Sequence, residues 1–418
     1  MSINAEQVLD FTLGCDENTI FQAQPVIGFA GSNASGKTNT LRAISFFKAF
    51  VTLSLNNSKS SLELLESFVT KEKNDIRLLF NLEINKIDYW YELVINKNKV
   101  VVENLSYNDS QENDIFLYQR TQENIIFNQN IQALAKEIVD DLPDTASLIT
   151  YFAKFKSQQH AVNILEYAEN ISENIYAEDS FITGFLDRSD LTRTNILAFL
   201  EQSHKDKTLR FLKYADTGIF NFEIISEKIN ASEMKKKLLG AHLSMAIDEE
   251  AHDEMNTKLA SYENKGIVFK KAIFYHHIDN EIVAFGFEQQ SNGTKDLINL
   301  LKLVFETLEK GSLLIIDEFG LKLHPDIVNF IIDIFNNPNE NEKNAQLIFS
   351  FHNSQFMNHL KPEQLWFASK NKQGATDLYP ASAFDFVQDL EGYDLEKYYR
   401  AGRFGGKPSI SYIPATTI

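Results

Sequence analysis

Apolar and polar residues alternate with strand-like spacing over much of the first hundred positions. A continuous apolar run at 25–30 favours a buried strand, and a run with helical spacing at 40–50 follows it after a short polar loop. Three further stretches, 76–84, 89–95 and 100–105, are rich in β-branched and aromatic residues and are separated by short polar turns. The pattern therefore predicts one buried strand, one helix and an antiparallel β-meander.

The pattern changes at residue 106, and helical spacing dominates as far as residue 265. Apolar residues recur three and four positions apart in stretches such as 161–168 and 196–203, with charged residues between them. Heptads are not sustained over many turns, so a long coiled coil is not expected. We therefore expect a mainly helical insert at 106–265, which separates an N-terminal lobe, 1–105, from a C-terminal lobe, 266–418.

Strands and helices alternate in the last third of the chain, after two strand-like stretches at 267–275 and 282–287. The alternating segments are helix 294–310, strand 313–316, helix 325–335, strand 346–351 and strand 364–368. Helices that alternate with continuous apolar strands indicate a parallel sheet, and the run at 25–30 is expected in the same sheet. The predicted fold class is α/β: a mixed sheet with a parallel core, the antiparallel β-meander and an inserted helical subdomain.

The composition of the chain mainly excludes certain classes of protein. The chain has 418 residues, 44% of them hydrophobic and 23% charged, which fits a globular protein with a large core. Its formal net charge of −18 disfavours non-specific binding of nucleic acid over the whole surface. The single cysteine, Cys15, excludes a disulfide framework within the chain. The start lacks signal-peptide features and no apolar run reaches spanning length, so we expect a cytoplasmic protein without membrane contact.

The polar loop after the first apolar run carries the pattern G-x-x-x-x-G-K-T, from Gly31 to Thr38. Glycines let successive backbone N–H groups point at one phosphate, and the following helix start adds positive dipole character. Lys37 is expected to reach the terminal phosphates, and Thr38 to place its hydroxyl on Mg²⁺. The alternative is a glycine turn that happens to carry a lysine, which the strand–loop–helix context disfavours. The expected nucleotide-binding residues here are Asn33, Ala34, Ser35, Gly36, Lys37, Thr38 and Asn39.

Two carboxylates follow the apolar strand expected at 313–316. Asp317 is placed to hold Mg²⁺, directly or through water, together with Thr38. Glu318, one residue further, is a candidate general base for an attacking water. A strand that ends in a solvated acidic turn is the alternative, and the phosphate-binding loop elsewhere in the chain makes it the weaker one.

Two polar loops add candidate residues. Ser291, Gly293 and Thr294 open the helix at 294–310 and form a second cradle suited to a phosphate, although an ordinary helix N-cap explains the same residues. His352 ends the strand at 346–351, where it can donate to a terminal phosphate and sense its loss. A capping or internally satisfied histidine is the alternative there.

The order of these motifs resembles that of the ABC-type ATPases, including their SMC and recombination-repair branch. Three stretches narrow the resemblance: 291–295 (SNGTK), 317–325 (DEFGLKLHP) and 399–408 (YRAGRFGGKP). They are similar to the compact AAA family ATPases of bacterial abortive-infection and phage-defence systems. Those are of the PARIS, Septu and retron-associated type, related to the ATPase half of OLD-type nucleases. The resemblance implies a P-loop NTPase fold of ABC-ATPase type with ATP and Mg²⁺ as cofactors.

The resemblance also implies a shared active site. Two heads pack head-to-tail, so that Ser291, Gly293 and Thr294 of one copy close on the phosphate held by Lys37 of the other. Catalytic roles fall to Lys37, Glu318 and His352, and the metal to Thr38 and Asp317. The implied partner is therefore a second copy of the chain, in a homodimer or a higher homo-oligomer. The glutamine loop of ABC ATPases has no clear counterpart, since Gln119 is a weak match.

Two functions follow from the resemblance. The first is an ATP-hydrolysing sensor in antiviral defence that controls a separate effector, such as a nuclease or toxin. A separate effector is expected because no room remains after His352 for the TOPRIM nuclease domain of OLD-type proteins. DNA or a phage-encoded molecule is the candidate trigger. The alternative is an SMC-like DNA-binding ATPase in DNA repair or chromosome maintenance, which basic spots at 205–210 and 235–237 would serve unless they are solvated helix faces.

Overall fold

The chain divides into two compact units in the computed structural model. The first combines Met1–Leu186 with Leu303–Ile418, and the second is Asp187–Lys302. The structure describes the following residues: 23–55, 75–108, 114–129, 131–132, 142–174, 190–201, 205–215, 217–229, 267–321, 323–372, 374–388 and 394–405.

A six-stranded sheet forms the centre of the first unit, in the order β14-β13-β1-β12-β11-β7. Five strands run parallel, and the edge strand β14 pairs antiparallel with β13. The central strands have nearly continuous apolar sequences, as expected where both faces of a sheet are covered. The strands are β1 (Val26–Ala30), β7 (Ser172–Asn174), β11 (Leu313–Ile316), β12 (Gln346–Ser350), β13 (Leu365–Lys370) and β14 (Thr376–Pro380).

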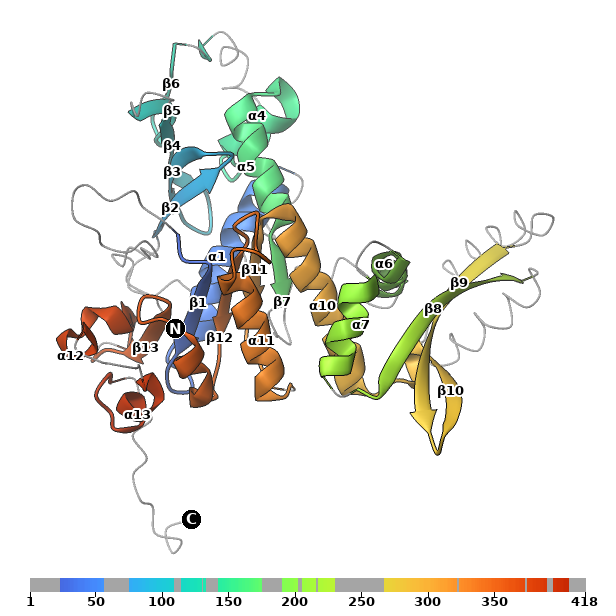
Figure 1. Cartoon of the computed structure of the whole chain (residues 1–418). Coiled ribbons are helices and arrows are strands. Elements are labelled where there is room, and N and C mark those ends of the chain that lie inside the picture. Colours follow the sequence, from blue (N-terminus) through green and yellow to red (C-terminus); the bar gives the residue numbers. More distant parts are fainter. Residues whose placement is uncertain are drawn as a thin grey trace, which may run out of the picture. The chain divides into compact units, whose positions relative to one another are not determined.

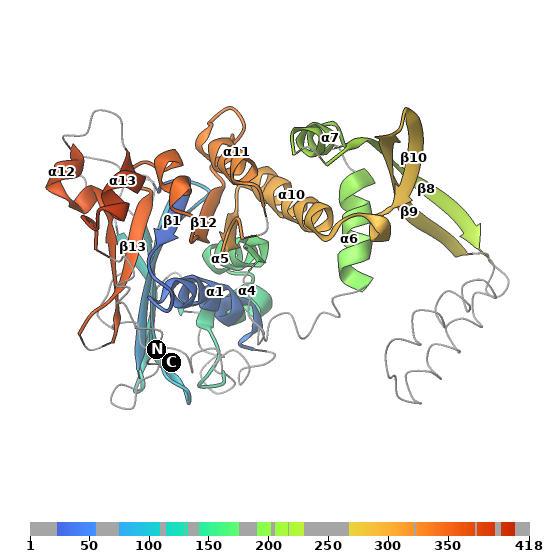
Figure 2. The same cartoon turned by 90° about the horizontal axis from the view of Figure 1, so that it is seen from below.

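Helices cover both faces of this sheet, as Figures 1 and 2 show. α1 (Lys37–Leu53) contacts β11 and β12 on one face, whereas α11 (Pro325–Asn336) contacts β1 and β12 on the other. α11 begins after His324, whose ring nitrogen accepts the N–H of Asp326. Shorter elements follow in the C-terminal part: η3 (Ser354–His359), η4 (Ala381–Ala383), α12 (Asp385–Gln388) and α13 (Leu395–Arg400).

The predicted β-meander is confirmed and is longer than expected. Five strands follow one another in an antiparallel sheet in the order β2-β3-β4-β5-β6. The first hairpin turns at Asn85 and Lys86, which both have left-handed backbones, with φ of 54° and 63°. Two such residues in succession give the tight turn whose twist matches that of the flanking strands. The strands are β2 (Ile76–Ile84), β3 (Ile87–Ile95), β4 (Val100–Asn108), β5 (Asp114–Arg120) and β6 (Ile125–Phe127).

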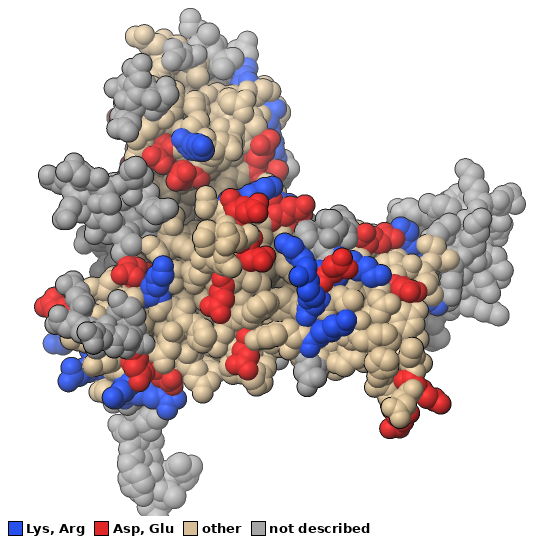
Figure 3. All heavy atoms as spheres, in the orientation of Figure 1, with Lys and Arg blue, Asp and Glu red and all other residues tan. Residues whose placement is uncertain are grey.

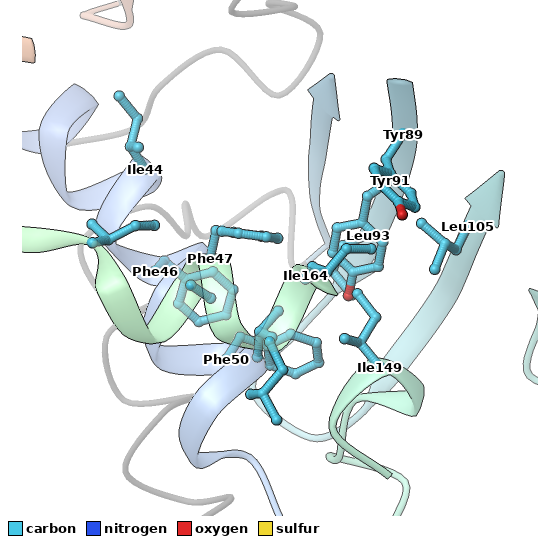
Figure 4. Packing of buried hydrophobic residues seen from close by; sticks show 14 of the residues in the cluster. Ile44, Phe46, Phe47, Phe50, Tyr89, Tyr91, Leu93, Leu105, Ile149 and Ile164 are labelled. Carbon is cyan, nitrogen blue, oxygen red and sulfur yellow. The ribbon is translucent and has the colours of Figure 1, made fainter. Parts of the chain in front are cut away.

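One hydrophobic core joins the meander, the central sheet and three helices. Figure 4 shows Phe46, Phe47 and Phe50 of α1 on the side of the helix that lies toward the meander. Phe47 lies 5.8 Å, ring to ring, from Tyr91 of β3. The helices α4 (Leu148–Lys156) and α5 (Gln159–Asn170) belong to the same core through their apolar faces. Residues with helical spacing between 106 and 265 therefore stabilise the first unit.

The buried carboxylate of Glu103 on β4 links the meander to α4. The carboxylate of Glu103 is fully buried and lies 3.3 Å from a guanidinium nitrogen of Arg120. Burial raises the pKa of the two tyrosines beside it, so their hydroxyls remain donors at neutral pH. The N–H of Leu148, in the first turn of α4, also donates to Glu103. The negative charge of the carboxylate therefore stabilises this helix start. The further donors to Glu103 are the hydroxyls of Tyr91, Tyr118 and Ser147.

The second unit contains a three-stranded antiparallel sheet, in the order β10-β9-β8, which contacts two helices. Phe222 of β8 and Phe274 of β9 are fully buried, with ring centroids 5.7 Å apart. No described helix in either unit is long and apolar enough to cross a membrane. The elements are α6 (Asp190–Glu201), α7 (Lys205–Tyr214), β8 (Ile219–Ile229), β9 (Ile267–Ile278), β10 (Glu281–Gly286), η2 (Phe287–Gln289) and the start of α10 (Asn292–Lys310).

The mixed sheet with a parallel core and antiparallel strands, expected from the sequence, is confirmed. The two compact units follow other limits than the lobes expected at 1–105 and 266–418, since β5, β6, α4 and α5 belong to the first unit. Much of 106–265 lies outside the described residues, so a mainly helical insert stays a prediction. In these terms the first unit carries the loop and the two carboxylates singled out above, and the second carries Ser291.

Candidate nucleotide-binding site

The G-x-x-x-x-G-K-T segment forms a tight loop between β1 and α1. Its backbone enters the left-handed region at Ala34 and Gly36, with φ of 60° and 108°. Gly36 is the N-cap of α1, no side chain caps this helix start, and its first turn holds no acidic residue. The first N–H groups of α1 therefore remain available to an anion, in the positive end of the helix dipole.

Two glycines of the loop are required by their surroundings. A Cβ at Gly31 would lie 2.4 Å from the carbonyl oxygen of Ala368 on β13. A Cβ at Gly36 would lie 2.0 Å from the hydroxyl oxygen of Thr376 on β14. That hydroxyl also donates to the carbonyl of Ser35, at 2.8 Å. The β13–β14 hairpin therefore backs the loop and fixes its curvature.

Gly36→Ala is expected to destabilise the first unit by about 2–5 kcal/mol, because a left-handed alanine costs roughly 1–2 kcal/mol and overpacking adds about 1–3 kcal/mol. Gly374→Ala is the matched control: its φ is 79°, but no atom lies within 4 Å of the added Cβ. This variant should lose only the roughly 1–2 kcal/mol of stability that a left-handed alanine costs. Urea unfolding followed by tryptophan fluorescence measures both, since Trp90 and Trp366 lie in the first unit. Equal losses in the two variants would contradict the steric role of Thr376.

Lys37 is buried inside this loop, with 5% of its surface exposed. Its ammonium donates to the carbonyl oxygens of Gly31 at 2.9 Å and Ser32 at 3.0 Å. Burial lowers the pKa of Lys37, and the negative charges of Asp317 and Glu318 partly oppose this shift. The lysine therefore folds back over the loop, with two carboxylates close enough to influence its charge.

Asp317 lies next to the first turn of α1, although the two are far apart in sequence. The register of β11 and β12 sets Ile316 opposite Phe349, so Asp317 and Ser350 follow side by side. One carboxylate oxygen of Asp317 accepts the hydroxyl of Thr38 at 2.8 Å, and the other accepts the hydroxyl of Ser350. With 2% of its surface exposed, Asp317 is held in one orientation.

These oxygen donors fit a magnesium ion. Mg²⁺ is usually bound by one or two carboxylates, a hydroxyl, water and substrate phosphate oxygens, and Thr38 with Asp317 provide the protein part of such a set. The part of the chain that the structure describes holds no cluster of three or more His, Cys, Asp and Glu side chains suited to a metal. The Ser35 hydroxyl is buried in the loop without a hydrogen-bond partner among the described residues. An orphaned donor there favours a bound ligand in the same cradle.

Glu318 has a left-handed backbone, with φ of 53°, which a non-glycine residue seldom adopts. Its N–H donates to the Ser350 hydroxyl at 2.9 Å, and Phe319 donates to the Ser350 carbonyl at 2.8 Å. The Glu318 carboxylate lies 3.6 Å from Nε2 of His352, and both side chains are 38% exposed. A strained, partly exposed carboxylate beside a histidine is suited to act on a ligand held by the loop.

The loop at Ser291 lies in the second unit, whereas Lys37 lies in the first. Ser291 accepts the N–H of Thr294 at 3.1 Å, and the two hydroxyls lie 2.8 Å apart. This is the N-cap that we weighed as the alternative. Ser291, Gly293 and Thr294 are exposed or half-buried, and their contact with a nucleotide stays a prediction.

The structure thus brings together most of the residues selected from the sequence. Lys37, Thr38, Asp317, Glu318 and His352 lie around one helix start, with the loop residues Asn33, Ala34, Ser35, Gly36 and Asn39 beside them. Sequence reasoning missed Ser350, although a serine at the end of the apolar strand QLIFS is a visible signal. It also missed Thr376, whose neighbourhood with the loop depends on β14 turning back along β13.

Two adjacent histidines lie on β9. His276 contacts Gln290 through Nε2 at 3.1 Å, whereas His277 stacks on Phe220 at 4.0 Å, so the two rings have separate partners. The basic spot 235–237 lies outside the described residues. Figure 3 shows Lys and Arg side chains interspersed with Asp and Glu over the face that it presents.

A family model described as "AAA domain, putative AbiEii toxin, Type IV TA system" matches residues 26–358. No curated protein matches the chain.

Solved structures match over most of the chain at low similarity. One is the Smc head domain with an extended coiled coil bound to the C-terminal domain of ScpA, from Pyrococcus furiosus: 14% identity, 88% of this chain, 93% of that chain, TM-score 0.35. The SMC head domain from Thermotoga maritima has 11% identity, covers 86% and 92%, and has a TM-score of 0.33. The recombination mediator protein RecF has 13% identity, covers 88% and 96%, and has a TM-score of 0.28. At such values these likenesses carry no argument about function.

Proposed function

Because the chain belongs to this AAA domain family, whose model spans residues 26–358, we propose that it binds ATP with Mg²⁺ and hydrolyses it. One observation carries the proposal: the 2.8 Å hydrogen bond between Thr38 and Asp317 at the uncapped start of α1. It joins a phosphate-binding loop to a magnesium-type carboxylate.

Each residue has a role in the proposed reaction. The loop N–H groups and Lys37 bind the phosphates, and Lys37 leaves the carbonyls of Gly31 and Ser32 to do so. Thr38 and Asp317 hold Mg²⁺, which neutralises phosphate charge when bound. Glu318 accepts a proton from the attacking water, whose oxygen bonds the γ-phosphorus as the bond to the β-phosphate oxygen breaks. His352 orients Glu318 from 3.6 Å.

The proposal extends to assembly and to biological role. Ser291, Gly293 and Thr294 of a second copy complete the site in a head-to-tail homodimer or a higher homo-oligomer. ATP binding and hydrolysis then switch the assembly between two states. We propose that this switch senses DNA or a phage-encoded trigger and controls a separate effector, such as a nuclease or toxin. The family description, which names a putative toxin and a TA system, is the observation that supports this role.

Asp317→Asn tests the metal part of the proposal. The variant keeps the size of the side chain but removes the charge that holds the metal, so half-maximal ATPase activity should need about 10- to 100-fold more Mg²⁺. Phosphate release by the purified chain over a Mg²⁺ series measures this. A wild-type chain that binds no ATP, or an Asp317→Asn variant with an unchanged Mg²⁺ requirement, would overturn the proposal.

DNA binding separates the two biological roles. An SMC-like DNA-binding ATPase should bind duplex DNA with an affinity that falls steeply as salt rises. Filter binding over a salt series, with and without ATP, measures the slope. A steep slope in the absence of any partner protein would favour the repair or chromosome-maintenance function.

A further inference from the structure

Lys370 places a second ammonium group beside the phosphate-binding loop. It is the last residue of β13 and pairs directly with Thr376, the first residue of β14. Its Nζ donates to the Thr376 hydroxyl at 2.9 Å, and that hydroxyl donates to the carbonyl of Ser35 at 2.8 Å. The Thr376 hydroxyl therefore bridges the ammonium group of Lys370 and the Ser35 carbonyl of the loop.

This charge has no anionic partner within the described parts of the chain. No carboxylate of the described residues lies within ion-pair distance of Lys370, and its Nζ donates to a neutral hydroxyl. The nearest acid on the hairpin, Asp377, pairs with Ser369, faces the other side of the strands and accepts from Asn371. The side chain of Lys370 is half-buried, and this burial lowers its pKa. Partly desolvated cations are normally paired, so an anion is the missing partner.

The order of the strands gives the side of the loop on which Lys370 acts. β13 flanks β1 on one side, whereas β12 and β11 flank it on the other. Asp317 and Glu318 follow β11, so the carboxylates and Lys370 lie on opposite sides of the loop. The carboxylate side takes Mg²⁺ and the terminal phosphate in the proposed function. A nucleotide in the loop has its nucleoside end away from that phosphate, toward β13.

We infer that Lys370 is a second nucleotide-binding cation, which contacts the phosphate nearest the nucleoside. The inference rests on the proposed function and adds a residue that the sequence motifs do not include. Thr376 is a positioning residue in this arrangement, because it holds Lys370 and the Ser35 carbonyl at the same time.

Binding of ADP and of pyrophosphate, both with Mg²⁺, by Lys370→Met tests the inference. Loss of one charge-assisted contact should weaken ADP binding about tenfold or more, measured by isothermal titration. Pyrophosphate with Mg²⁺ fills the two phosphate positions nearest Lys37 and the metal and leaves the position beside Lys370 empty, so its binding should change less than about twofold. Lys372→Met is the matched control, since Lys372 is an exposed lysine of the same hairpin, and it should bind both ligands as the wild type does.

Lys370→Gln separates the effect of the positive charge from that of the hydrogen bond to Thr376, because glutamine is neutral but can still donate to this hydroxyl. It should weaken ADP binding as the methionine variant does. Unchanged ADP binding in Lys370→Met, or equal weakening of ADP and pyrophosphate, would overturn the inference and leave the proposed function standing. A wild-type chain that binds neither ligand would overturn both.

Discussion

Glu318→Gln is expected to bind ATP about as tightly as the wild type and to hydrolyse it about 100- to 1,000-fold more slowly. Glutamine keeps the size of the side chain and the backbone bond from residue 318 to the Ser350 hydroxyl. It removes the carboxylate beside His352 that accepts a proton from water in the proposed reaction. Phosphate release in steady state, together with equilibrium binding of ATP, separates the two effects.

Asp326→Asn is the matched control for Glu318→Gln. Asp326 is an exposed carboxylate at the start of α11, 3.5 Å from His324, so the variant also removes one negative charge from beside a histidine. It should leave turnover within about twofold, since a surface ion pair contributes little. Wild-type turnover in Glu318→Gln would contradict its role as general base.

Glu318→Gln also tests whether copies of the chain assemble. If Ser291 and Thr294 of a second copy complete the site, Glu318→Gln should accumulate as a homodimer or larger assembly when ATP is present, because hydrolysis no longer opens it. Light scattering after size-exclusion chromatography measures the mass. A monomer at saturating ATP would contradict the head-to-tail arrangement and leave the nucleotide site itself intact.

The central strands, and the positions of the loop and of the two carboxylates at their ends, could be predicted because their signals are local. Continuous apolar runs such as LLII in β11 mark strands that are buried on both faces. The glycine-lysine-threonine pattern indicates phosphate binding within a few residues. The two carboxylates after β11 indicate metal binding and proton transfer in the same local way. That Thr38 and Asp317 meet followed from placing both strands in one parallel sheet, an expectation that their hydrogen bond matches.

Ser350, Thr376 and Lys370 could not be assigned in the same way. Each acts through a neighbour on another strand, so its role depends on strand order and register, which local periodicity does not contain. The same limit applies to α4 and α5. Their helical spacing was visible, but the packing of Ala161 and Ile164 into the core of the first unit depends on which surface they meet.

Lys37→Ala is expected to lower ATP affinity about 100-fold or more, because it removes the charge-assisted contact that the loop makes with the phosphates. The loss has a second cause. Without the ammonium, the carbonyls of Gly31 and Ser32 lose their donor, and the charges of Asp317 and Glu318 repel the phosphates unopposed. Isothermal titration with ATP and with ADP measures the change.

Lys48→Ala is the matched control, because Lys48 lies on the same helix and also donates to a backbone carbonyl, that of Ile171 at 2.7 Å. Removing it should reduce stability and leave ATP affinity within about twofold. In cells challenged with a phage panel, protection should disappear with Lys37→Ala and persist with Lys48→Ala at matched protein levels. Wild-type affinity in Lys37→Ala would refute the nucleotide site. Lost affinity with intact protection would leave the ATPase in place and refute its use as the defence switch.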